Sequence, residues 1–197
     1  MANKLESTFL NMVLVLTIIT CIAGAALAGV FKLTEEPIRL SNLAKQKVAL
    51  EAVCPEFDNN PLEESRQVEV NGVQATIYTA RKGGVVVGSA VETITKKGFS
   101  GEIKVMVGFE SDGRIKGYEV LKHAETPGLG SKMQEWFSAT DRPAQSIIGK
   151  NPGVNNLTVS KKGGEIDAIT AATISSDAFL DAVKNAYDAV QLNTTAN

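Results

Sequence analysis

The sequence predicts an α+β domain, an antiparallel sheet flanked by helices, with one N-terminal transmembrane helix as its anchor. Three observations predict this architecture. Residues 7–31 carry no charge, residues 67–121 alternate apolar and polar side chains between turn signals, and residues 174–192 repeat apolar side chains at helical spacing. The 197 residues carry a net charge of −2. That balance fits one membrane segment plus one ordinary globular domain, and it argues against a nucleic-acid partner.

The uncharged run exceeds the roughly 20 residues that a membrane-spanning helix needs. We therefore predict a short tail at residues 1–8 and a single transmembrane helix at residues 9–31. The alternative is a cleaved signal peptide, because residues 26–28, Ala-Leu-Ala, resemble a small-residue cleavage site. The apolar part is longer than the roughly 7–15 residues typical of such peptides, which favours an uncleaved anchor.

Basic residues on either side of the predicted span bear on its orientation. Lys4 precedes the span, while Lys32, Arg39, Lys45 and Lys47 follow it. By the positive-inside rule alone, this count places the large domain in the cytoplasm. The rule loses force when a long domain follows the span, since such domains are translocated largely regardless of their charge.

A helical linker region is predicted over residues 32–66. Residues 34–37, Thr-Glu-Glu-Pro, have the pattern of a helix start, with a capping hydroxyl, two acids in the first turn and an early proline. The helix is expected to end near Val53, because Pro55 and the turn-forming residues 58–61 follow it.

The domain at residues 67–192 is expected to contain five strands that pair as a meander. Asn71-Gly72 and Gly83-Gly84 separate alternating runs, as in two-residue hairpins. A short helix over 131–139 and a brief strand over 157–160 should follow. The five strands are expected at 67–70, 73–80, 85–95, 102–109 and 114–121.

A terminal helix at about 174–192 is expected to pack against the sheet, with residues 193–197 as a frayed tail. Its buried stripe should consist of Phe179, Ala182, Val183, Ala186 and Val190.

No metal site is expected. The chain has one histidine and two cysteines, and Cys21 and Cys54 lack the spacing of metal ligands. Both cysteines are expected to be packed apolar residues.

Residues 167–176 form a hydroxyl-rich turn that leads directly into the terminal helix. A helix start leaves several backbone N–H groups unpaired, and such a position favours an anionic group such as phosphate. Taken alone, Thr170, Thr173, Ser175 and Ser176 favour simple capping, because these residue types are common at helix caps. The composition of this stretch therefore leaves a ligand site and simple capping both open.

A second informative stretch, residues 123–132, lies between a predicted strand and a predicted helix. Gly128 and Gly130 would let backbone approach a ligand closely, and Thr126 and Ser131 could bind its polar atoms. An ordinary strand-to-helix loop has the same composition.

Together, the two stretches behind one membrane anchor resemble the FMN-binding domain family of membrane redox complexes. The resemblance is strongest to the G subunits of Rnf ion-translocating electron transport complexes and covers nearly the whole chain. It implies that residues 67–192 are an FMN-binding domain and that the protein is an electron-transfer subunit of a complex coupling ferredoxin and NAD chemistry to ion translocation. Its implied partners are the other membrane subunits. The implied location is the bacterial cytoplasmic membrane, with the large domain on the outer, periplasmic face.

The resemblance also implies a cofactor site. In that family an Asp, a Ser or Thr three residues later and a Gly-Ala-Thr tripeptide mark a threonine that a flavin transferase, using FAD, joins to FMN through a phosphoester. By this correspondence Thr173 carries the FMN, and Asp167, Thr170 and Ala172 match the signature. Ala171 replaces the usual Gly, which adds a methyl group at a turn expected to be closely packed. The expected pocket wall consists of Glu125, Thr126, Gly128, Leu129 and Gly130.

The resemblance implies no catalytic residue beyond the flavin and no complete active site in this chain alone. One alternative is the FMN-carrying C subunit of a sodium-translocating NADH:quinone oxidoreductase, which shares the signature but is expected to be longer. The other is a membrane-anchored binding domain without redox function, whose two stretches are only turns and caps.

Overall fold

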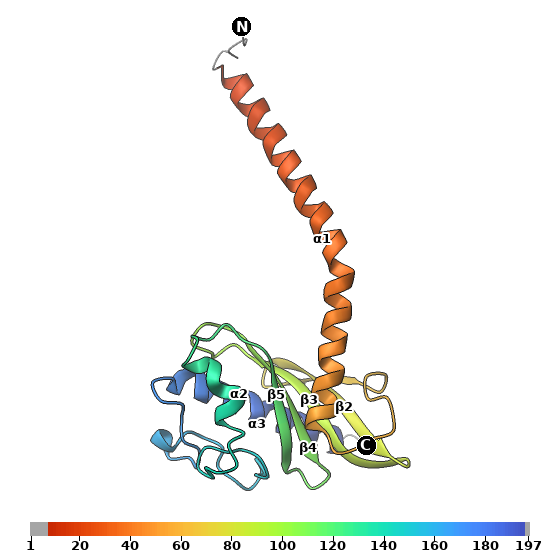
Figure 1. Ribbon diagram of the computed structural model, residues 1–197, viewed down its shortest axis with the longest axis vertical. Coiled ribbons are helices and arrows are strands. Elements are labelled where there is room, and N and C mark those ends of the chain that lie inside the picture. Colours follow the sequence, from red (N-terminus) through yellow and green to blue (C-terminus); the bar gives the residue numbers. More distant parts are fainter. Residues whose placement is uncertain (1–7, 196–197) are drawn as a thin grey trace. The chain divides into compact units, whose positions relative to one another are not determined.

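The computed structural model describes residues 8–195 of the chain (Figure 1). Residues 1–7, which include Lys4 and most of the predicted tail, and residues 196–197 lie outside this range. The chain divides into two units at residues 44 and 45. The elements are α1 Phe9–Val53, β1 Arg66–Val70, β2 Val73–Lys82, β3 Val85–Thr95, β4 Ile103–Glu110, β5 Ile115–Lys122, α2 Met133–Trp136 and α3 Thr173–Thr195, with single 3₁₀ turns at Gly130–Lys132 and Ser160–Lys162.

In the first unit, α1 is long and apolar enough to cross a membrane. Its apolar window is wholly unburied by protein, and Cys21 within it is exposed rather than packed as predicted. The predicted helix start at Thr34 is wrong, because its hydroxyl donates to the carbonyl of Val30 at 2.8 Å. The hydroxyl thus finds its acceptor in the preceding turn, and the helix continues through Pro37. Its end at Val53 is as predicted.

In the second unit, the five strands form one antiparallel sheet in the order β1-β2-β3-β4-β5, which confirms the predicted meander. Both two-residue turns have positive φ at their two central residues: 51° and 75° at Asn71 and Gly72, and 58° and 80° at Gly83 and Gly84. This backbone matches the right-handed twist of the paired strands, which explains the choice of Asn and Gly at these positions.

One face of the sheet is covered by α3, mainly over β3 and β4. Phe179 stacks on Phe137 with ring centroids 4.6 Å apart and meets Tyr118 edge-on at 4.9 Å. In the predicted stripe, Phe179, Ala182, Val183 and Ala186 are buried, and Val190 packs against the core while partly exposed. The helix continues to Thr195, beyond its predicted end at Leu192.

The segment between α2 and α3 lacks the predicted strand at 157–160. Val159 makes an isolated parallel bridge with Ile166, and a 3₁₀ turn begins at the next residue. Gly163, at φ 84°, donates to the carbonyl of Ser160. The chain therefore turns before a ladder can form.

The other face of the sheet is covered by the last two turns of α1, which belong to the second unit. Ala49, Leu50, Val53 and Cys54 pack there against side chains of β2, β3 and β4. Burial raises the pKa of the Cys54 thiol to about 12. Cys54 thus remains a protonated, packed residue, as predicted, because burial in apolar surroundings disfavours the thiolate.

Glycines in the strands allow the end of α1 to approach the sheet. A methyl group on Gly108 would collide with the Val53 carbonyl and lie 2.9 Å from the Val53 Cβ, whereas one on the paired Gly117 would have its nearest neighbour at 3.4 Å, an ordinary contact. The backbone of α1 therefore lies directly against that of β4.

Gly108→Ala should destabilise the domain by about 1–3 kcal/mol, the usual cost of overpacking a filled core. The added methyl group must displace the end of α1 or the strand below it. Chemical denaturation of the full chain in detergent, followed by near-ultraviolet circular dichroism, measures this loss. Gly117→Ala is the matched control. Equal stability of the Gly108 variant and the parent would contradict the close approach.

Candidate functional site

A cavity of about 330 Å³ lies where the two informative stretches meet. Three segments form its walls: the loop between β3 and β4, the loop after β5 and the first residues of α3. The sequence predicts two of these segments but does not place them together in space. The lining residues are Phe99, Thr126, Leu129, Gly130, Ala171, Ala172, Thr173, Ile174 and Ser175.

The four hydroxyl groups of residues 170–176 have different surroundings. Ser176 Oγ accepts from the N–H of Ile169 at 3.0 Å and donates to the carbonyl of Ala172 at 2.9 Å. The Ser175 hydroxyl donates to Glu125. Thr170 is exposed and is not part of the cavity wall.

Thr173 differs from these three residues. It is the first residue of α3, it is half-buried, and its side chain lines the cavity. Across residues 8–195, no hydrogen bond or ion pair of its hydroxyl is found. Thr173 therefore combines an uncommitted hydroxyl with a place in the cavity wall.

The turn before α3 explains the residue type at position 171. Ala172 N–H donates to the Ile169 carbonyl at 2.9 Å, which closes a four-residue turn whose third residue is Ala171. Ala171 has φ 60°, the left-handed conformation that a type II turn needs at this position and that glycine adopts without strain. The predicted close packing is wrong, since Ala171 is exposed. The added methyl group matters through the backbone conformation, not through lack of space.

Glu125 lies behind the cavity wall rather than in it. Its side chain is buried, with 4% of its surface exposed. One carboxylate oxygen accepts from the Ser100 N–H at 3.0 Å, and the other accepts from the Ser175 hydroxyl. A methyl group on Gly130 would lie 2.9 Å from the carboxylate. Gly130 thus provides the space that Glu125 occupies.

Other predicted site residues also lie outside the cavity wall. Asp167 is exposed, and its carboxylate accepts from the Ser160 hydroxyl at 2.9 Å. Gly128, at φ 76°, donates its N–H to Ser131 Oγ and shapes the loop. The predicted residues thus divide into a cavity wall and a supporting set around it.

Sequence reasoning missed Phe99 and Ile174, both exposed apolar residues of the cavity wall. Phe99 lies in a loop with glycines at positions 98 and 101, a composition that allows close backbone approach but is equally typical of an ordinary turn. Ile174 carries no signal in the sequence beyond its place at the start of a helix.

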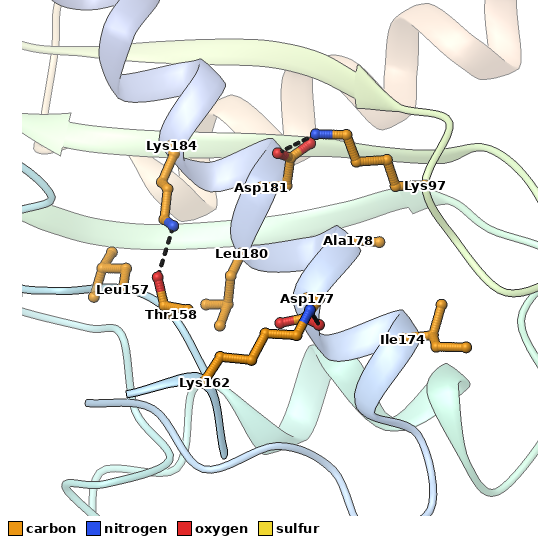
Figure 2. A pocket seen from close by; sticks show the side chains of 10 residues that line it. All are labelled: Lys97, Leu157, Thr158, Lys162, Ile174, Asp177, Ala178, Leu180, Asp181 and Lys184. Atoms are coloured by element: carbon orange, nitrogen blue, oxygen red, sulfur yellow. Dashed lines mark hydrogen bonds and ion pairs between the residues drawn. The ribbon is translucent and has the colours of Figure 1, made fainter. Parts of the chain in front are cut away.

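A second cavity, of about 380 Å³, lies beside the first turns of α3 (Figure 2). Its charged side chains are already partnered: Lys97 pairs with Asp181 at 2.6 Å, and Lys162 pairs with Asp177 at 2.5 Å. Lys184 donates to the Thr158 hydroxyl at 2.9 Å, as Figure 2 shows. These contacts tie neighbouring loops to α3 and leave few polar groups free for a ligand.

Comparisons with known proteins identify relatives of the chain. The model of the FMN-binding domain family matches residues 98–188, which include all three walls of the cavity. The chain is 33% identical over 188 residues to the G subunit of the ion-translocating oxidoreductase complex of Vibrio cholerae, a match covering 90% of this chain and 88% of the relative. It is 36% identical to the proteins of the same name from Haemophilus influenzae, over 86% and 83%, and Yersinia pestis, over 81% and 79%.

Ala171→Gly should stabilise the domain by roughly 1 kcal/mol, because glycine removes the strain of an L-residue at positive φ. For a chain of this size the midpoint of thermal unfolding should rise by about 2–4 °C. Calorimetry of the full chain in detergent measures the shift. Ala172→Gly is the matched control: Ala172 is buried and has no positive φ, so this change should lower the midpoint. A fall in both variants would contradict the strained turn.

Proposed function

The chain belongs to the family of G subunits of ion-translocating oxidoreductase complexes, and we propose that it carries FMN covalently on Thr173 and passes electrons within such a complex. One observation supports this most directly. Thr173 is the hydroxyl-bearing residue of the 167–176 stretch that both lines the cavity and has an uncommitted hydroxyl among the described residues.

The cavity fits the chemistry of FMN. Its volume of about 330 Å³ falls within the range of small-molecule sites, roughly 300–1,000 Å³. Thr173 begins α3, and the first described N–H of this helix that donates to a backbone carbonyl is that of Ser176. The preceding N–H groups and the helix dipole favour a phosphate on Thr173. Phe99, Leu129 and Ile174 offer apolar surface to an aromatic ring.

The attachment chemistry is proposed to come from an external flavin transferase. The Thr173 hydroxyl would lose its proton to a base of the transferase, its oxygen would bond to the FMN phosphorus of FAD, the pyrophosphate bond would break, and AMP would leave. A threonine hydroxyl needs activation for this step, and among residues 8–195 no acid or base is hydrogen-bonded to Thr173. Asp167 and Thr170 are exposed, so a second protein can contact and recognise them.

The bound flavin would supply electron transfer between other subunits of the complex, and the protein would hold and orient it. We propose that the complex exchanges electrons with ferredoxin and NAD. The match covers 88% of the Vibrio cholerae G subunit, so the two chains are similar in length. This similarity favours the G subunit over the alternative C subunit, which is expected to be longer.

The apolar part of α1 is proposed to cross the cytoplasmic membrane, with the large domain on the outer face. A helix that exposes an apolar surface of this extent is not stable in water, and a bilayer buries it. A covalent bond would retain the cofactor on that face without relying on binding affinity.

Thr173→Ala should abolish covalent flavin. Coexpression of the full chain with an active flavin transferase, followed by a denaturing gel read for flavin fluorescence, measures this directly. The parent band should be fluorescent and the variant band dark, because alanine has no oxygen to bond to phosphorus. Thr126→Ala, which removes another threonine of the same wall, is the control and should remain fluorescent. A dark parent band with a transferase shown to be active would refute the covalent assignment.

Protease added to intact spheroplasts should digest the large domain if it lies on the outer face. An antibody against the C-terminal domain detects the loss on a blot. A cytoplasmic marker protein in the same sample must stay intact until lysis. Protection of the domain before lysis would instead place it in the cytoplasm, as the count of flanking basic residues suggests.

A further inference from the structure

Glu125 is the buried carboxylate nearest to the cavity, and its charge has no cationic partner in the described structure. The ion pairs found among residues 8–195 do not include it. Both of its oxygens accept hydrogen bonds, one from the Ser100 N–H and the other from the Ser175 hydroxyl. A buried charge that lacks a counter-ion exerts its field over nearby space with little screening.

Two residues of the cavity wall contact the Glu125 carboxylate. Gly130 and Ser175 both line the cavity, and both touch the carboxylate from the other side. Ser100, its third contact, follows Phe99, which also lines the cavity. Glu125 therefore joins all three segments of the cavity wall and places a negative charge directly behind them.

We propose that Glu125 is a positioning residue that fixes the cavity wall and lowers the reduction potential of the flavin held there. This inference rests on the proposed FMN site. Each electron that the flavin accepts without a proton adds one negative charge to the ring. A fixed carboxylate behind the wall opposes that added charge, so the oxidised form is favoured. Electrons come from the redox partner in the complex and from dithionite in the test.

The test is a mediated potentiometric titration of the full, flavin-loaded chain in detergent. Glu125→Gln keeps the size of the side chain and can still accept from Ser100, but it removes the charge. The midpoint potential should shift to more positive values. Glu125→Asp, which retains the charge, should return the potential toward that of the parent. A role confined to wall structure predicts no such dependence on charge.

Glu110→Gln is the matched control. Glu110 ends β4 and lies seven positions along the strand from Ile103, the end next to the Phe99 loop, a distance of about 24 Å. Removal of this partly exposed charge should leave the potential unchanged, because solvent and salt screen it over such a distance.

Flavin fluorescence of the parent band on a denaturing gel is recorded first, so that failure of the FMN assignment is seen separately. A fluorescent parent whose Glu125→Gln variant has an unshifted potential overturns the role of Glu125 and leaves the FMN site intact. If Glu125→Gln loads no flavin, Ser175→Ala serves as the second variant. Loss of the Ser175 hydroxyl removes a hydrogen-bond donor that partly offsets the negative charge of the Glu125 carboxylate. The midpoint potential of the flavin should therefore become more negative. An unchanged or more positive value overturns the inference.

Discussion

The packing of α3 across β3 and β4 determines where every part of the candidate site lies. Phe179, inserted between Phe137 and Tyr118, fixes the position of the helix on the sheet. Its N-terminus then lies at the end of the sheet where the loop between β3 and β4 and the loop after β5 also emerge. Three segments far apart in the sequence meet there because one buried helix face leaves α3 a single place to lie.

The two faces of the sheet are packed against their helices in different ways. Large apolar side chains fill the space beneath α3, whereas glycines bring the end of α1 into backbone contact on the opposite face. Leu50 and Met106 are buried on this face, and the close backbone contact leaves the end of α1 little freedom of position. The end of α1 and the sheet therefore pack closely against each other within the second unit.

Local patterns predicted most of the fold. The two hairpin turns depend on residues that adopt positive φ, and the alternation of the strands depends on one buried face, so both are visible in a short window of sequence. The helix start predicted at Thr34 could not be excluded from the local sequence. A threonine hydroxyl can cap a helix start, but it can equally donate to the carbonyl of a preceding helical turn, as that of Thr34 does. The predicted strand at 157–160 is absent because this segment pairs at a single position, where Val159 forms a bridge with Ile166. Such a long-range contact is not visible in a short window of sequence.

The site was predictable only in part, for a similar reason. Motif resemblance picked out Thr173 and the loop at 125–130, but burial of Glu125 depends on how that loop meets α3. Phe99 carries no local signal of its place in the wall. Residues whose role comes from contacts between distant segments cannot be recognised from sequence spacing.

The turn from Ile169 to Ala172 is held by hydrogen bonds within the chain. Ser176 holds both ends of it, through the Ile169 N–H and the Ala172 carbonyl. In the proposed maturation, folding therefore comes before modification, and the transferase would recognise a finished surface rather than an extended peptide. Chains without flavin would then be folded precursors awaiting assembly, not misfolded molecules destined for degradation.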